Sequence, residues 1–341
     1  MGFFNFFTQE IAIDLGTANT LIIYKDKVVI DEPSIVAQNR NTEKVIAIGK
    51  EAQMMHGKTH DKIRTIRPLK DGVIADFHMA EAMIRGMIKK ITTMKGLFTP
   101  SLRMVICIPS GITEVEKRAV RDSAEHAGAK EVYLIHEPMA AAIGMGIDVE
   151  EPTGSMIIDI GGGTCEIAVI ALGGIICDKN IRIAGDEFNQ DIEELMRKQH
   201  NILIGERTAE RIKIEVGSAL PELEDPPDDY LVHGRDLMTG IPKEIKVSYQ
   251  EIAHALDKSI SKVEDAILSA LELTPPELSA DIYRTGIFMA GGGAMLRGLD
   301  KRISKRTKLP VHVAEDPLRA VARGTGVALK NIDRFHFLMK N

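Results

Sequence analysis

A strand that ends in aspartate and is followed by a turn of small residues occurs twice in the chain, as IAIDLGTANTLIIY around Asp14 and as MIIDIGGGTCEIAVI around Asp159. Each copy has an apolar run on both sides of the turn, which predicts a tight β-hairpin. Glycine and threonine at a hairpin tip leave backbone N–H groups open to a phosphate oxygen. The aspartates would supply hard or water-bridged oxygen ligands for magnesium. The repeat therefore predicts a polyphosphate site gripped from both sides by two facing tips.

A third glycine cluster lies near the end of the chain, in GIFMAGGGAMLRGLDKRI from Gly286. We expect a buried strand, a turn at Gly291, Gly292 and Gly293, and then a helix. Such a turn lets backbone lie flat against the sugar and α-phosphate of a nucleotide. Each cluster alone could equally be an ordinary tight turn. Three of them in one chain favour a nucleotide site.

Composition limits the class of protein. A chain of 341 residues with 44% hydrophobic content can build two domains with full-sized cores. A net charge of -6 argues against a nucleic-acid partner. The three cysteines form no CxxC pair, so neither a zinc site nor a disulfide framework is indicated, and a reducing cytoplasm fits best. Asp159 and Glu166 interrupt the most apolar stretch, so no membrane-spanning helix is predicted.

The first seven residues hold four of the ten phenylalanines, Phe3, Phe4, Phe6 and Phe7. The segment lacks the basic leader, long apolar stretch and cleavage site of a signal peptide. It could be a strand lead-in that packs into the core, or a short anchor at a membrane interface. We favour the anchor, because four phenylalanines exceed what one short lead-in needs.

A second apolar tip is predicted in IKKITTMKGLFTPSLR, where Leu97 and Phe98 occupy a loop broken by Gly96 and Pro100. Large apolar residues beside basic ones fit insertion among anionic lipid head groups. The loop could equally pack back onto its own domain. One copy would bind a membrane weakly, whereas many copies on one polymer would bind far better through effective concentration. The basic neighbours are Lys89, Lys90, Lys95 and Arg103.

The rest of the chain alternates between strand and helix patterns. VICIPSG from Val105 predicts a buried strand. The next helix would begin after Thr113, with Glu116 at the capping-box position and Gly128 as its stop. A helix of small residues should begin near Glu137 and Pro138, and its small side chains would let two domains pack closely. Residues 31–76 and 184–250 are expected to be insertions, one into each half.

Ten stretches together resemble the actin superfamily, which includes the seventy-kilodalton heat-shock chaperones and the sugar kinases. Over essentially the full length, the chain is similar to the MreB family of bacterial actins. These stretches are IAIDLGTANTLIIY, DGVIADF, VICIPSG, EPMAAAIG, PTGSMIIDIGGGT, IAGDEFN, HNILIGERTAERIKIEVGSA, GRDLMTGIP, TPPELSADI and MAGGGAMLRGLD.

The resemblance implies an α/β, actin-like ATPase fold of two lobes, each with a ribonuclease-H-like core, and four subdomains around a nucleotide cleft. It implies subdomain IA at residues 1–31, 77–146 and 325–341, IB at 32–76, IIA at 147–183 and 251–324, and IIB at 184–250. It also implies slow ATP hydrolysis, a homopolymer of paired protofilaments on the inner face of the cytoplasmic membrane, membrane-protein partners of the cell-elongation machinery, and maintenance of rod shape.

The resemblance also implies roles for single residues. Asp14 and Asp159 would hold Mg2+ through water, Glu137 would orient the attacking water with help from Thr164, and Glu210 and Lys213 would reach the ribose and adenine of ATP. His136 stands where many relatives have an acidic residue, and Cys165 where they have threonine. The backbone expected around the nucleotide comprises Thr17, Ala18, Asn19, Thr20, Gly161, Gly162, Gly163, Thr164, Gly291, Gly292, Gly293 and Ala294.

Three classes of function share such an ATP site. A filament protein is favoured, and a small-molecule kinase is the alternative. A kinase of this superfamily usually has an acceptor-binding Asp near the γ-phosphate, where Glu137 is expected here. A chaperone would need a substrate-binding domain after the ATPase lobes, whereas this chain ends at Asn341. The predicted membrane tips fit neither rival.

Overall fold

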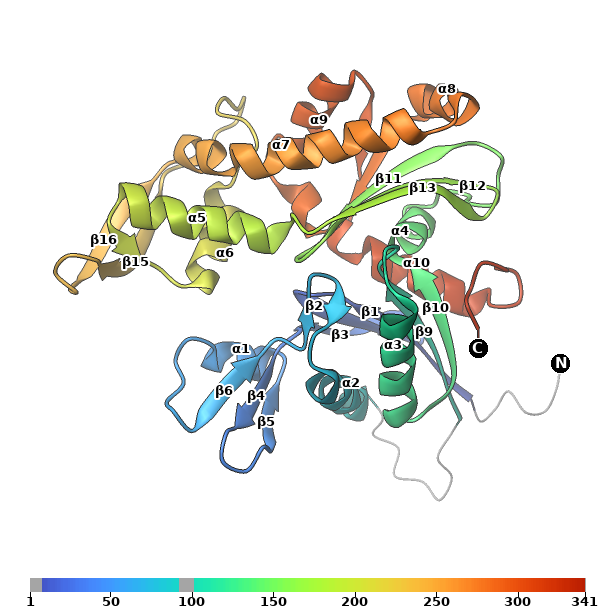
Figure 1. Ribbon diagram of the computed structural model, residues 1–341, viewed down its shortest axis with the longest axis horizontal. Coiled ribbons are helices and arrows are strands. Elements are labelled where there is room, and N and C mark those ends of the chain that lie inside the picture. Colours follow the sequence, from blue (N-terminus) through green and yellow to red (C-terminus); the bar gives the residue numbers. More distant parts are fainter. Residues whose placement is uncertain (1–7, 92–100, 341) are drawn as a thin grey trace. The chain divides into compact units, whose positions relative to one another are not determined.

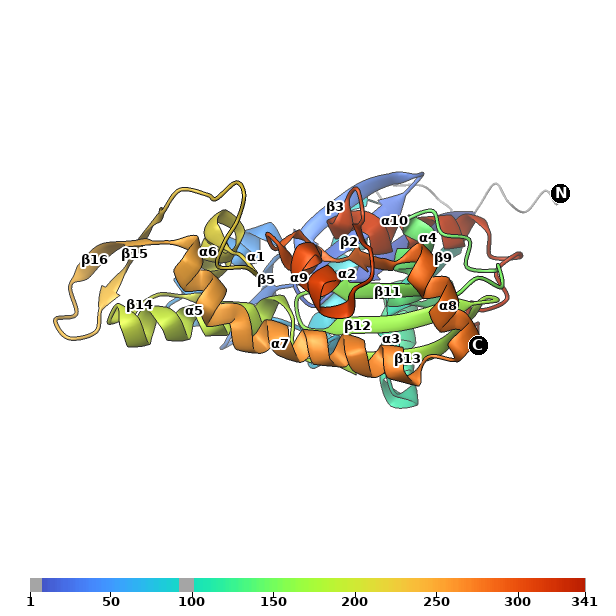
Figure 2. The same cartoon turned by 90° about the horizontal axis from the view of Figure 1, so that it is seen from above.

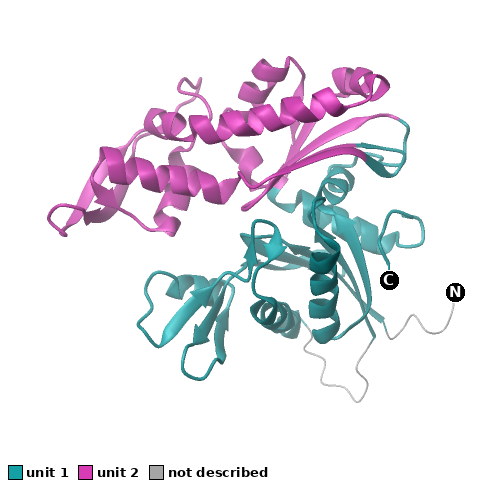
Figure 3. Cartoon of the chain, viewed as in Figure 1, with its two compact units in different colours: residues 1–152, 170–175, 318–341 teal, residues 153–169, 176–317 magenta. Residues whose placement is uncertain are grey.

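The computed structural model describes residues 8–91 and 101–340 (Figure 1). The residues predicted to contact a membrane, Phe3, Phe4, Phe6, Phe7, Leu97 and Phe98, lie outside the described residues. Contacts within the chain divide it into two compact units (Figure 3). Unit 1 comprises Met1–Pro152, Ile170–Ile175 and Leu318–Asn341, and unit 2 comprises Thr153–Val169 and Ile176–Pro317. The finer division into four subdomains stays a prediction.

Unit 1 is built on a five-stranded sheet in the order β10-β9-β1-β2-β3. Strands β1 and β2 form the first predicted hairpin, in which Asp14 pairs with Leu21 and Leu15 with Thr20. Strand β9 runs parallel to β1, and β10 runs parallel to β9. The strands are β1 (Thr8–Leu15), β2 (Asn19–Tyr24), β3 (Lys27–Pro33), β9 (Ser101–Ile108) and β10 (Ala129–His136).

Alternate residues of β1 pack against the helices that cover one face of the sheet. Ile11, Ile13 and Leu15 are buried in one core cluster with residues of α2 (Phe77–Ile91) and α3 (Glu114–His126). Helices α4 (Glu137–Gly144) and α10 (Ala320–Lys330) also contact this sheet. The predicted capping box of α3 is confirmed, because Thr113 and Glu116 bond each other's backbone N–H groups at 3.3 and 2.8 Å.

Helix α4 packs against α10 backbone to backbone. A Cβ atom at Gly144 would overlap the carbonyl oxygen of Ala320, and a Cβ atom at Gly324 would overlap that of Ala140. Every residue of α4 from Pro138 onward is buried. The close packing that the small residues predict is therefore found against a helix of the same unit.

A smaller part of unit 1 has its own core. A three-stranded sheet, β5-β4-β6, packs with α1 (Lys50–Met55) around Ile35, Ala37, Ala47 and Ala52. Its residues fall within the first predicted insertion. The remaining strands of the unit are β4 (Val36–Asn39), β5 (Val45–Ile48), β6 (Ile63–Ile66), β7 (Leu69–Lys70) and β8 (Val73–Ile74), of which the last two pair with each other.

Unit 2 is built on a second five-stranded sheet in the order β13-β12-β11-β17-β18, although residues 170–175 of β12 and β13 cluster with unit 1. Strand β17 is parallel to β11 and β18, and Asp159 pairs with Ala290. All residues of β11 and β12 are buried, which explains the apolar runs on both sides of Asp159. The strands are β11 (Ser155–Ile160), β12 (Cys165–Ala171), β13 (Gly174–Ile181), β17 (Ile287–Ala290) and β18 (Val311–Val313).

The helices of unit 2 share one core cluster with this sheet. Helix α7 (Tyr249–Leu273) is the longest described helix and runs alongside α5 (Gly185–Gln199) (Figure 2). The others are α6 (Glu206–Val216), α8 (Pro276–Thr285) and α9 (Leu299–Thr307). A small sheet, β14-β15-β16, lies within the second predicted insertion. Its strands are β14 (Ile202–Leu203), β15 (Tyr230–Asp236) and β16 (Pro242–Val247).

Replacing Gly144 by alanine should destabilise the protein by about 3 kcal/mol, because the new methyl group meets backbone that cannot move without separating α4 from α10. Urea unfolding would measure the loss. Gly174→Ala is the matched control, since the nearest atom to its Cβ would be the Ala171 oxygen at an ordinary 3.7 Å. Equal unfolding midpoints for the two variants would contradict the described packing.

Candidate functional site

Ser34 holds the first glycine-containing loop, residues 16–20, which comprises the turn after β1 and the first two residues of β2. Its hydroxyl donates to the Gly16 carbonyl at 2.6 Å, and its N–H donates to the Ala18 carbonyl at 2.9 Å. The Thr20 hydroxyl lies 2.8 Å from that of Ser34. A side chain at Gly16 would press on the Asn19 carbonyl, with its Cβ at 2.7 Å. These hydrogen bonds fix the carbonyls of a tight turn, and tight turns of small residues are places where backbone N–H groups can bind an anion.

Asp14 precedes this loop and accepts a hydrogen bond from the thiol of Cys107, with 3.1 Å between Sγ and Oδ1. Burial raises the pKa of Asp14 to about 6, although the thiol hydrogen bond acts in the opposite direction. Burial also raises the pKa of Cys107, and the charges of Asp14 and Glu137 raise it further. The thiol therefore stays protonated and remains a donor.

Glu137 begins α4 directly after β10, whose last residue, His136, pairs with Ile108 of β9, while Ile13 of β1 pairs with Ile106, so Glu137 and Asp14 both lie at the same end of this sheet beside Cys107. Pro138 follows in the first turn, as predicted. The His136 ring lies 3.3 Å from the Pro109 carbonyl through Nδ1. Unit 1 thus brings together Asp14, the loop at 16–20 and Glu137 around Cys107. Thr17 of that loop also accepts a hydrogen bond from the Gly72 N–H at 3.0 Å.

The second loop, residues 161–164, connects β11 to β12 in unit 2. It closes as a tight turn, in which the Gly161 N–H donates to the Thr164 carbonyl at 2.9 Å. The first N–H groups of α5 hold it from outside: Gly185 donates to Gly161 at 3.1 Å, and Asp186 donates to Gly162 at 2.7 Å. Asp159 and Thr164 are buried at the two ends of this turn.

The triple-glycine turn lies directly against the end of β11. Gly291 has a left-handed backbone (φ 79°), and a Cβ atom there would overlap an Asp159 carboxylate oxygen. A Cβ atom at Gly293 would overlap the side chain of Ile160. The predicted strand and following helix are confirmed as β17 and α9, with the short 3-10 helix η2 (Gly292–Met295), which includes the buried Ala294, between them.

Helix α6 carries Glu210 and Lys213 one turn apart, as predicted. The Lys213 ammonium donates to the Gly185 carbonyl at 2.8 Å, so α6 reaches the start of α5. Beyond α6, the Ala219 N–H donates to the Arg297 carbonyl at 2.8 Å, and Arg297 donates back to the Ile214 carbonyl at 3.1 Å. The end of α6 is therefore tied to the segment after the triple glycine.

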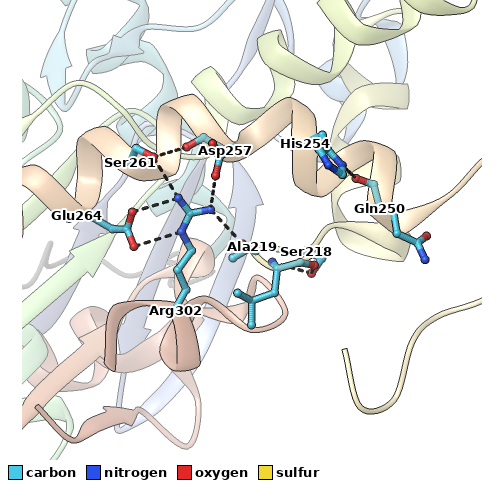
Figure 4. A network of polar contacts seen from close by, with 9 residues as sticks. Ser218, Ala219, Gln250, His254, Asp257, Ser261, Glu264 and Arg302 are labelled. Atoms are coloured by element: carbon cyan, nitrogen blue, oxygen red, sulfur yellow. Dashed lines mark hydrogen bonds and ion pairs between the residues drawn. The ribbon is translucent and has the colours of Figure 1, made fainter. Parts of the chain in front are cut away.

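Arg302 of α9 reinforces this tie (Figure 4). Its guanidinium binds both carboxylate oxygens of Glu264, at 3.0 and 3.2 Å, and donates to Asp257 at 2.8 Å. It also donates to the Ser261 hydroxyl and to the Ala219 carbonyl, both at 3.1 Å. One side chain thus joins α9, α7 and the segment after α6 by charge-assisted hydrogen bonds.

Sequence reasoning missed Ser34, Cys107 and Gly185. Each lies far along the chain from the residue that it holds, so the local sequence pattern does not indicate the contact between them. Gly185 had the clearest available signal, a glycine at the start of an expected helix. Each unit supplies one aspartate, Asp14 or Asp159, and a carboxylate is a ligand that magnesium takes together with waters and substrate phosphates. Within residues 8–91 and 101–340, no three His, Cys, Asp or Glu side chains gather into a metal-binding group.

A sequence profile of the family described as MreB/Mbl protein matches residues 8–336. The chain belongs to the MreB/Mbl family. It is 48% identical to the cell shape-determining protein Mbl of Bacillus subtilis (strain 168), with 96% of this chain and 98% of the relative covered. It is also 48% identical to the cell shape-determining protein MreB of Escherichia coli (strain K12), with 96% and 95% covered.

Solved structures agree with this family assignment. MreB 5 of Spiroplasma citri bound to AMPPNP is 41% identical, with a TM-score of 0.89 over 96% of this chain and 97% of that chain. Its ADP-bound form is 40% identical, with a TM-score of 0.90 over 96% and 99%. The MamK double helical filament, at 20% identity and a TM-score of 0.79 over 96% and 99%, supports the fold alone. The predicted actin-like α/β fold is confirmed.

None of the described helices is both long and apolar enough to span a bilayer.

Replacing Asp14 by asparagine should stabilise the nucleotide-free protein at pH 7. A carboxyl group whose pKa rises from 3.8 to about 6 on folding favours the folded state while it is protonated, so its contribution is lost as pH rises through 6. The loss approaches about 2–3 kcal/mol above pH 7. Thermal unfolding in EDTA between pH 4 and pH 7.5 measures it. We expect the variant to exceed wild type at pH 7 and to approach it at pH 4, while the exposed-site control Asp225→Asn should follow wild type throughout.

Proposed function

We propose that the chain is an ATP-binding and ATP-hydrolysing cytoskeletal protein that assembles into filaments and maintains cell shape. The observation that carries the proposal is the pair of braced glycine-containing loops, each following a buried aspartate-ending strand, in a chain about 40% identical to proteins solved with AMPPNP and ADP. Relatives named for determining cell shape favour this role over a small-molecule kinase.

In this proposal the loops at 16–20 and 161–164 bind phosphate through backbone N–H groups. Gly291, Gly292, Gly293 and Ala294 lie along the sugar and α-phosphate, and Glu210 and Lys213 reach the ribose and adenine. Asp14 and Asp159 would hold magnesium through water. A bound magnesium ion would neutralise charge that develops on the phosphates during transfer.

Glu137 is proposed to accept a hydrogen bond from the attacking water, with Thr164 helping to place that water. The residue stands at the first turn of a helix whose own position is set by backbone contact with α10. Positioning and charge neutralisation do most of the work in phosphoryl transfer, so a weak base suffices. Hydrolysis would then be slow and follow assembly, and its rate would set the lifetime of the filament.

Replacing Glu137 by glutamine or alanine should leave ATP binding and assembly intact while slowing phosphate release about 100-fold. Glutamine keeps the shape of the side chain and removes its negative charge, whereas alanine removes both. Comparing the two variants therefore separates the effect of the charge from the effect of lost packing. Phosphate release after assembly is the measurement. Release at the wild-type rate in both variants would remove Glu137 from this role.

The filaments are further proposed to lie on the inner face of the cytoplasmic membrane, beside membrane proteins of the cell-elongation machinery. Phe3, Phe4, Phe6 and Phe7 would anchor each subunit, together with Leu97 and Phe98. Deleting residues 1–7 should weaken lipid binding without lowering thermal stability. If the segment is instead a lead-in that packs into the core, the deletion should lower thermal stability and leave lipid binding unchanged.

Sedimentation of the purified protein with magnesium and ATP, with and without anionic liposomes, tests the whole proposal. We expect pelleting that requires ATP and increases with liposomes, with the nucleotide-free sample as reference. A protein that binds ATP but stays monomeric under every condition would support the kinase instead.

A further inference from the structure

The start of α5 serves as a clamp on the second loop. Ala184 at its N-cap contributes no side-chain hydrogen bond, and the first N–H groups of the helix bind carbonyls of the loop instead. Gly185 donates to Gly161, and Asp186 donates to Gly162 at the shorter distance of 2.7 Å. The position of the loop therefore depends on how firmly the first turn of α5 is held.

Lys213 grips that first turn from α6. Its ammonium lies 2.8 Å from the Gly185 carbonyl oxygen. The fit is close, because a Cβ atom at Gly185 would stand 3.2 Å from Nζ of Lys213 and 3.3 Å from the Gly161 carbonyl oxygen. A side chain at this position would require the lysine or the loop to shift by a few tenths of an ångström.

One peptide group carries both contacts. The C=O of Gly185 and the N–H of Asp186 belong to the same peptide unit, so Lys213 binds its oxygen while Gly162 accepts from its nitrogen. A cation on a carbonyl oxygen polarises the peptide and strengthens its N–H as a donor. The charge of Lys213 thus acts on the loop through a rigid, planar unit.

Helix α6 is a firm base for this contact. Its end is bound to Arg297, and the segment after it is bound to Arg302, whose guanidinium also engages Glu264 of α7 (Figure 4). These contacts hold the backbone of α6 from which the Lys213 side chain extends.

We propose that Lys213 is a positioning residue for the loop at 161–164, acting through the Gly185–Asp186 peptide. The proposal rests on the proposed nucleotide function and revises one part of it: Lys213 contributes through the loop at 161–164, and the contact with ribose and adenine is left to Glu210. A lysine that only reaches ribose and adenine would contribute to the binding of every adenosine compound. A lysine that positions the loop contributes to phosphate binding and leaves adenosine itself almost unaffected.

Replacing Lys213 by methionine removes the charge and keeps most of the side-chain length. Affinities for ATP, ADP and adenosine, each with magnesium, are the measurement. We expect ATP and ADP to bind about tenfold more weakly, the value of one charge-assisted hydrogen bond, and adenosine to change less than twofold. Arg211→Met, an exposed cation of the same helix, is the matched control and should bind all three like wild type.

Gly185→Ala provides an independent test that keeps the lysine. Its methyl group would press on both Nζ and the Gly161 carbonyl, so the same phosphate-selective loss is expected. An equal loss of adenosine and ATP affinity in Lys213→Met, or no loss in either variant, overturns the proposal. A wild-type protein that binds no nucleotide would instead overturn the proposed function, and circular dichroism of each variant separates both results from misfolding.

Discussion

Hydrogen bonds to the carbonyl oxygens of two small-residue turns are the interaction on which the candidate site depends. Such turns have few side chains with which to hold their own shape. In unit 1 the brace is Ser34, which binds the carbonyls of Gly16 and Ala18 with its hydroxyl and its N–H. In unit 2 it is the start of α5, whose N–H groups bind Gly161 and Gly162. The two copies of the repeat are therefore held in shape by different elements, a serine side chain and backbone in unit 1 and a helix N-terminus in unit 2.

The repeat itself, and much of the fold around it, could be predicted from the sequence. The strand and turn at Asp14, the strand and turn at Asp159, and the capping box at Thr113 and Glu116 all depend on neighbours within a few residues. The residues within such a short pattern are themselves the ones that determine the strand, the turn or the helix start. The family resemblance added the actin-like architecture, which the solved relatives confirm.

The braces of the site could not be predicted, because they join residues that are distant in the chain. Cys107 is 93 positions from Asp14, and Lys213 is 28 positions from Gly185. Nothing in the pattern around Cys107 indicates a carboxylate partner, and its buried strand looks like any other. The resemblance implies contacts of Lys213 with ribose and adenine, whereas its contact with Gly185 depends on the packing of α5 against α6. Such pairings are set by tertiary packing, which local propensity does not encode.

The contact of α4 with α10 bears on which substitutions the core of unit 1 can accept. Where side chains separate two helices, a series of core substitutions can gradually shift one helix against the other. Here peptide backbone meets peptide backbone at Gly144 and Gly324, so no side-chain volume lies between them to be exchanged. The surrounding core can drift while the helix that begins with Glu137 keeps its place. The position of this helix is therefore set by the backbone of α10 and depends little on which side chains fill the surrounding core.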